Sequence, residues 1–101
     1  MVTIKKTVIF TKWLDGLKDM HGRAKILTRL QRFSEGNFGD VKPVGDGVSE
    51  IRVNYGPGYR SYYWYMEEDV VILLNGGDKK TQARDIKKAK SLAKQLKEEK
   101  S

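Results

Sequence analysis

The fold is decided by residues 49–74, which read SEIRVNYGPGYRSYYWYMEEDVVILL. Polar and apolar side chains alternate over Ser49–Tyr55, and the aromatic-rich run Tyr59–Met66 follows a Gly-Pro-Gly turn. An alternating run before such a turn and an aromatic-rich run after it predict a β-hairpin. After a second turn, Val70–Leu74 is apolar without alternation, which is typical of a strand covered on both faces. The stretch therefore predicts three consecutive strands.

Helices are expected on the N-terminal side of these strands. Ile4–Phe10 is β-branched and apolar enough for a first strand, and Thr11 is then expected to cap a helix whose apolar residues recur at helical spacing. A His-Gly pair at 21–22 is expected to end that helix. A second helix begins near Arg23 and stops at Gly36. The short link between the two helices predicts an antiparallel helical hairpin.

The remaining segments complete the order of elements. The glycine-punctuated stretch Asn37–Gly47 is expected to be a loop with a short strand at Val41–Val44, and two glycines at 76–77 end the last strand. A lysine-rich helix follows, and residues 97–101 are expected to fray. Its apolar stripe comprises Ala83, Ile86, Ala89, Leu92, Ala93 and Leu96. This stripe either packs against the sheet or accepts a partner segment.

Taken together, residues 1–101 predict a single α+β domain with the order β-α-α-β-β-β-α and one short extra strand. The sheet is expected to be mostly antiparallel, with the N-terminal helical hairpin on one face and a separate C-terminal helix. A chain of 101 residues buries one modest core.

The composition excludes several classes of protein. There is no cysteine, and His21 is the one histidine, so a disulfide framework, a thiol nucleophile and a metal site are not expected. The longest apolar run is far shorter than the roughly 20 residues that span a bilayer. Lysines interrupt the apolar residues at the N-terminus, which argues against a signal peptide and for a cytoplasmic protein.

The charge is basic and unevenly distributed. Lys and Arg number 20 against 13 Asp and Glu, giving a net charge of +7. Residues 79–101 hold nine basic and three acidic side chains, which leaves only +1 for the first 78 residues. Such an excess favours a polyanionic partner such as nucleic acid, an acidic protein or an anionic membrane surface.

One face of the predicted hairpin gathers arginines and aromatic side chains. If the Gly-Pro-Gly turn joins Tyr55 directly to Tyr59, the alternation of side chains places six residues on this face: Glu50, Arg52, Asn54, Arg60, Tyr62 and Trp64. A three-residue Gly-Pro-Gly connection would place Arg52 opposite Tyr62, and the Lys79-Lys80 pair follows the neighbouring strand. Cations interleaved with aromatic rings are features of single-stranded nucleic-acid sites. The alternative is an ordinary sheet face in which Tyr62 and Trp64 are covered by the last helix.

Three motifs carry a family resemblance. They read GDGVSEIR at 45–52, GPGYRSYY at 56–63 and LLNGGDKKTQARDIKKA at 73–89. Together with Trp13-Leu14 and the run from Arg29 to Asp40, they resemble the RelE/ParE superfamily of toxins over residues 8–93. The resemblance is strongest to its HigB-like addiction module killer (phage Gp49-like) branch.

The resemblance implies the toxin of a type II toxin–antitoxin pair and a RelE-like fold. It implies a metal-independent endoribonuclease that cleaves mRNA on the ribosome and needs no cofactor. The implied partners are a small helix-turn-helix antitoxin and ribosome-bound mRNA, with no membrane involved. The alternatives are a ParE-like DNA gyrase poison and a non-catalytic module that binds antitoxin or RNA, because one fold hosts several functions.

The implied cleavage requires the 2′-OH of RNA to attack the adjacent phosphate. A base takes the 2′-OH proton, an acid protonates the leaving oxygen, and cations stabilise the developing charge. Arginine serves as a phosphate clamp because it does not release its proton. Cations crowded together lower one another's pKa, so a lysine among arginines can act as a base.

The resemblance assigns candidate catalytic and RNA-binding residues. Arg60 is expected to hold the scissile phosphate, and Arg52 is expected to make a second phosphate contact or, alternatively, a salt bridge to Glu50. Lys79 and Lys80 are candidates for a phosphate ligand or proton carrier, with a solvated helix entry as the alternative.

Two further residues enter the RNA-binding set. Tyr62 is a candidate for base stacking, with a core role as the alternative, and Gln82 is carried by the motif without a mechanism. His21 is expected to have a surface or capping role. The better characterised nucleases place a tyrosine or histidine near the C-terminus, whereas this chain has a lysine-rich helix there.

Overall fold

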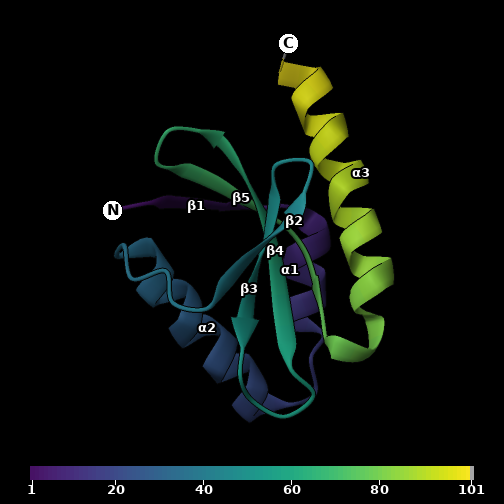
Figure 1. The fold of residues 1–101 in the computed structure, drawn as a ribbon. Helices are drawn as coiled ribbons and strands as arrows, with labels where there is room; N and C mark the ends of the chain where they lie inside the picture. Colours follow the sequence, from purple (N-terminus) through teal and green to yellow (C-terminus); the bar gives the residue numbers. More distant parts are fainter. Residues whose placement is uncertain (101) are drawn as a thin grey trace.

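The computed structural model describes residues 1–100 and contains one five-stranded sheet in the order β1-β5-β4-β3-β2 (Figure 1). The strands are β1 (Thr3–Lys6), β2 (Val41–Gly45), β3 (Val48–Val53), β4 (Tyr59–Glu67) and β5 (Val70–Gly77). β1 and β5 run parallel, and the other neighbours are antiparallel. The predicted α+β class, the mostly antiparallel sheet and the short extra strand β2 are therefore confirmed.

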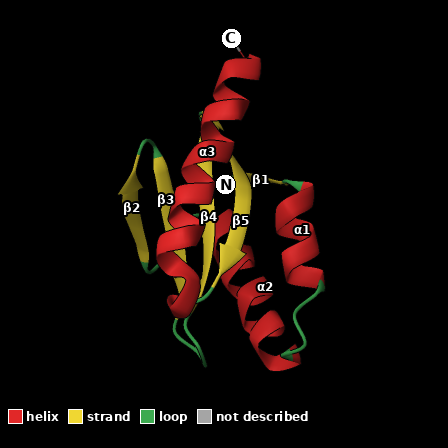
Figure 2. Cartoon of the chain, turned by 90° about the vertical axis from the view of Figure 1, so that its right-hand side faces the viewer, coloured by secondary structure: helices red, strands yellow, loops and turns green. Residues whose placement is uncertain are grey.

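Helices cover both faces of the sheet (Figure 2). They are α1 (Val8–Asp15), α2 (Met20–Ser34), the 3₁₀ turn η1 (Lys79–Thr81) and α3 (Gln82–Lys100). On the α1 and α2 side, the core includes Phe10, Ile26, Phe33, Ile51, Tyr63 and Leu73. On the α3 side, the buried residues are Val48, Tyr62, Ile72, Leu74, Ala89 and Ala93. Successive residues of β5 enter opposite cores, which is why Val70–Leu74 shows no alternation.

The first strand is shorter than the sequence predicts. Thr7, not Thr11, caps α1: its hydroxyl accepts the Phe10 N–H at 3.0 Å and donates to the Leu74 carbonyl at 2.7 Å. Strand pairing ends at Lys6, and Phe10 turns fully into the core as a helical residue. The contact with β5 therefore overrides the β-branched character of the segment.

The His-Gly pair at 21–22 does not break a helix, because both residues lie in the first turn of α2. Asp19 caps this helix by accepting the Gly22 N–H at 2.9 Å. A Cβ at Gly22 would lie 2.5 Å from the Tyr59 ring. The glycine is needed for close packing of α2 on β4, whereas Gly36, at φ +92°, follows the end of α2 as predicted.

The hairpin register differs from the expected one by two residues. Arg52 lies opposite Arg60, and the loop between the two strands spans residues 54–58, whereas a three-residue loop at 56–58 was expected. A shift of two leaves every side chain on its predicted face.

The last helix is longer than the sequence predicts. α3 continues through Lys100, where a frayed tail was expected from Lys97, and Ser101 lies outside the described residues. Its apolar stripe packs against the sheet, except for Ala83, which is exposed. Within residues 1–100, none of the helices combines the length and apolar character needed to cross a bilayer.

Candidate functional site

A hollow of about 400 Å³ lies at the end of the β3–β4 hairpin, where the connecting loop meets η1. We call it the hairpin groove. Its lining comprises Asp40, Arg52, Val53, Asn54, Tyr55, Gly56, Pro57, Gly58, Arg60 and Lys79. Three of the predicted site residues, Arg52, Arg60 and Lys79, thus line one concavity, whereas Lys80 lies outside the lining; both lysines are exposed.

A buried carboxylate holds the two arginines. Arg52 and Arg60 face each other across β3 and β4, a pairing of like charges that is unfavourable on its own. Glu50, 0% exposed, lies between them: its Oε1 is 3.1 Å from Arg52 Nε, and its Oε2 is 3.5 Å from Arg60 Nε. The Gln82 amide donates to both carboxylate oxygens at 3.2–3.3 Å. This network fixes two guanidiniums side by side.

Arg60 is less exposed than its position on a strand face suggested. Its side chain is 11% exposed, and Nη1 donates to the Gly58 carbonyl at 2.6 Å. Gly58 has φ +76°, and a Cβ there would lie 3.1 Å from Arg60 Nη1. The loop therefore needs glycine to close over the guanidinium. Arg60→Ala would therefore remove the partner of a buried carboxylate and not merely an exposed side chain.

Backbone contacts place Lys79 at the groove. Its N–H donates to the Pro57 carbonyl at 3.3 Å, which joins η1 to the hairpin loop. Asp78 caps η1 by accepting the N–H groups of Lys80 and Thr81. This contact brings Lys79 into the groove lining, while Lys80 lies outside it. Both lysine side chains are exposed at the entry to α3, as the alternative interpretation of the sequence held.

Tyr62 has the core role that the sequence left as an alternative. Its ring is 0% exposed in the core beneath α3, and burial raises the pKa of its hydroxyl. No face of the ring is open to a base, which corrects the expectation of stacking. Gln82, which the sequence assigned no mechanism, supports Glu50 from the start of α3.

Comparison with known proteins adds the family. Residues 12–98 match the family described as phage-derived protein Gp49-like. The chain belongs to this family. An uncharacterised protein of Haemophilus influenzae is 50% identical over 95 residues, which are 94% of this chain and 96% of that protein. The resemblance to the Gp49-like branch of the RelE/HigB-type family, which the sequence motifs indicated, is confirmed.

A solved structure supports the fold of this Gp49-like chain. One chain of the RelBE2 toxin–antitoxin complex from Mycobacterium tuberculosis aligns with a TM-score of 0.52 and 22% identity. The alignment covers 77% of this chain and 98% of that one. The predicted RelE-like fold is therefore confirmed.

Sequence reasoning missed several residues of the site in this Gp49-like protein. The sequence named Glu50 as the alternative salt-bridge partner of Arg52, and the 3.1 Å contact confirms that alternative, but the contact of Glu50 with Arg60 was not predicted. Asp40 and Tyr55 also line the groove. Loops bring them there, and residues in loops show no periodic sequence pattern from which their position could be predicted. Within residues 1–100, no group of three or more His, Asp or Glu side chains is arranged to hold a metal ion.

Proposed function

We propose that this protein is the toxin of a type II toxin–antitoxin pair and inhibits translation by cleaving mRNA on the ribosome. The observation that carries the proposal is the pair of guanidiniums fixed by a buried carboxylate and facing one groove with a lysine. The family membership supports the toxin role. Translating ribosomes place this activity in the cytoplasm.

The groove suits a phosphodiester. Glu50 accepts a hydrogen bond from Arg52 Nε and forms an ion pair with Arg60 at 3.5 Å, and Arg60 Nη1 donates to Gly58, so the remaining guanidinium N–H groups can donate to phosphate oxygens. Arg60, the more enclosed of the two, holds the scissile phosphate, and Arg52, 31% exposed, makes the second contact. Because these donors are already oriented, they stabilise charge that develops on the phosphate without reorganising.

The reaction proceeds by attack of the ribose 2′ oxygen on the adjacent phosphorus. A bond forms between the 2′ oxygen and phosphorus while the bond to the 5′ oxygen breaks, which leaves a 2′,3′-cyclic phosphate and a 5′-hydroxyl. The 2′-OH proton must be accepted, and the leaving oxygen must receive one. Lys79 is the proposed proton carrier or third phosphate ligand. No imidazole lines this groove, so we propose that the ribosome supplies substrate orientation.

The proposed partner is an antitoxin, a small helix-turn-helix protein. The RelBE2 structure is a complex of a toxin with its antitoxin, and its fold is shared here. The +7 net charge of this chain favours an acidic binding segment in that partner.

The test is induction of the gene followed by primer extension on translated mRNA. The wild type is expected to produce discrete cuts in translated transcripts. Arg60→Lys keeps a cation beside Glu50 but loses the planar fork, so cleavage is expected to fall by about 10²–10³-fold with thermal stability retained. Lys12→Gln, an exposed site on α1, is the matched control.

Two outcomes overturn the proposal. Growth arrest with intact transcripts contradicts mRNA cleavage, and gyrase-dependent DNA breakage instead identifies a gyrase poison. Arg60→Lys with wild-type cleavage and a native melting curve contradicts the assigned role of the guanidinium.

A further inference from the structure

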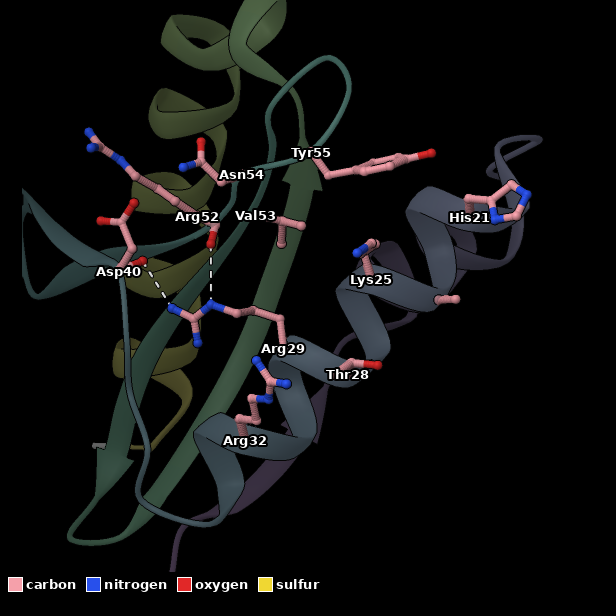
Figure 3. Close-up of a pocket in the computed structure, with 11 residues that line it drawn as sticks. His21, Lys25, Thr28, Arg29, Arg32, Asp40, Arg52, Val53, Asn54 and Tyr55 are labelled. Atoms are coloured by element: carbon pink, nitrogen blue, oxygen red, sulfur yellow. Dashed lines mark hydrogen bonds between the residues drawn. The ribbon is translucent and has the colours of Figure 1, made fainter.

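A second hollow of about 470 Å³ lies between α2 and the end of β3 (Figure 3). We call it the helix groove. Its lining comprises His21, Ala24, Lys25, Thr28, Arg29, Arg32, Asp40, Arg52, Val53, Asn54 and Tyr55. The family resemblance and the proposed cleavage assign no role to this surface, although it is larger than the hairpin groove.

The two grooves are continuous around the end of β3. Asp40 and the run Arg52–Tyr55 line both of them. In Figure 3 the Arg52 backbone faces α2 while its guanidinium points away from Arg29. A single-stranded RNA that leaves the paired arginines would therefore pass Asn54 and Tyr55 and enter the helix groove.

One face of α2 supplies the charge of the helix groove. Lys25, Arg29 and Arg32 recur at spacings of four and three, which places them on the same side of the helix. Asp40 is the acidic residue of the lining. The groove therefore has an excess of cations, which favours a polyanion.

Arg29 shapes this groove as well as adding charge. Its Nε donates to the Arg52 carbonyl at 3.3 Å and its Nη2 to the Asp40 carbonyl at 3.1 Å (Figure 3). Burial lowers the pKa of Arg29, Asp40 opposes that change, and the like charge of Arg32 adds to it. The guanidinium nevertheless stays protonated at neutral pH. Lys25 and Arg32, in contrast, are exposed on the helix surface.

An aromatic ring stands at the junction of the grooves. Tyr55 is half-buried, and the Lys25 ammonium lies 5.7 Å from its ring centroid. An aromatic ring beside cations is the arrangement on which a base of a single strand stacks while its phosphates are neutralised. An acidic peptide would use the cations but gain nothing comparable from the ring.

We propose that the helix groove binds the single-stranded RNA that continues beyond the scissile phosphate, with Tyr55 stacking on a base and Lys25 and Arg32 contacting phosphates. The inference rests on the proposed function, because it takes RNA as the substrate of the hairpin groove. It adds a second binding site that fixes the register of the strand.

The experiment measures binding to 2′-O-methyl oligouridylates, which lack the attacking hydroxyl and are not cut. A trinucleotide reaches one groove, and a nonanucleotide reaches both. Fluorescence anisotropy at several salt concentrations compares the wild type with the double variant Lys25→Gln, Arg32→Gln. The matched control is Lys12→Gln, Lys18→Gln, two exposed lysines that line neither groove.

The wild type is expected to bind the nonanucleotide more tightly than the trinucleotide. The helix-groove variant loses that advantage, and its slope of log K against log salt for the nonanucleotide decreases in magnitude by about 1.4, since two phosphate contacts are lost. The helix-groove variant is expected to bind the trinucleotide with wild-type affinity. The control variant is expected to bind both oligonucleotides with wild-type affinity. Tyr55→Leu is expected to weaken binding of the nonanucleotide without changing the salt dependence of that binding.

The opposite results separate this inference from the proposed function. Equal binding of both oligonucleotides, or an unchanged slope in the double variant, overturns the helix groove even if induced cells show cut mRNA. If the wild type cuts no mRNA but the helix-groove variant still loses the tighter binding of the nonanucleotide, the RNA-binding role of the helix groove stands and the proposed cleavage is rejected. Deca-glutamate that binds wild type as tightly as the nonanucleotide overturns the assignment to RNA.

Discussion

Replacement of Glu50 by glutamine is the sharpest perturbation of the proposed site. Glutamine keeps the volume and one oxygen but removes the charge that holds Arg52 and Arg60 in register. The carboxylate is fully buried, so no water replaces its contacts directly. Arg52, with 31% of its side chain exposed, can be rehydrated, whereas Arg60, at 11%, keeps only its bond to the Gly58 carbonyl.

The expected loss of stability follows from these contacts. A hydrogen bond to a charged group contributes about 1.5–3 kcal/mol, and a neutral one contributes about 1 kcal/mol. Because the Arg52 contact is largely recovered by water, Glu50→Gln is expected to cost about 1–3 kcal/mol. In a chain of this size that lowers Tm by roughly 5–20 °C. Glu50→Ala leaves Arg60 without its carboxylate and is expected to cost about 3–4 kcal/mol.

Activity is expected to separate from binding in the same variant. Removal of a negative charge makes the groove more positive, so affinity for single-stranded RNA stays equal or rises. Cleavage is expected to fall by about 10²-fold, because the guanidiniums lose their fixed orientation. Primer extension and fluorescence anisotropy measure the two quantities below the Tm of the variant. Glu68→Gln, in the exposed β4–β5 turn, removes the same charge elsewhere.

Either of two results would refute the positioning role of Glu50. A Glu50→Gln protein that cuts mRNA like the wild type shows that the carboxylate does not position the arginines. Parallel losses of binding and cleavage show instead that the network only stabilises the fold.

Three other perturbations test particular contacts. Gly76→Ala would place a Cβ 2.3 Å from the Trp13 ring, so it is expected to cost about 1–3 kcal/mol by thermal melting, and less in a Trp13→Leu background. The pKa of Asp19 is lowered from 3.8, chiefly by the hydrogen bond from the Gly22 N–H and then by that from the Tyr59 hydroxyl. The ionised carboxylate therefore stabilises the folded protein fully above pH 3.8, and this contribution is lost as the pH falls through the lower pKa of the folded state. Calorimetry is therefore expected to show a smaller decrease of Tm between neutral and acidic pH for Asp19→Asn than for the wild type. Lys79→Gln is expected to lower the salt slope of RNA binding by about 0.7, while the same change at the neighbouring lysine leaves the slope unchanged.

Much of the architecture could be predicted because it follows local periodicity. The alternation over Ser49–Tyr55 and an assumed turn length predicted which hairpin side chains share a face, and a register error of two residues did not alter that result. The position of the first helix was predicted less well. Thr11 and Thr7 are both plausible caps by sequence, and the contact of Thr7 with the Leu74 carbonyl, 67 residues away, selects between them.

The sequence by itself determined that Glu50 and Arg52 lie on one face of their strand, because the pleat reverses side-chain direction at every residue. That Arg60 shares this face rested on an assumed register, and the pairing of Arg52 with Arg60 confirms it. Only the tertiary structure decided what that face exposes. Packing of α3 buries Tyr62, and the contact of η1 with the hairpin loop brings Lys79, but not Lys80, into the groove. Burial and the convergence of distant loops depend on contacts between segments far apart in the chain, and local residue patterns do not specify them.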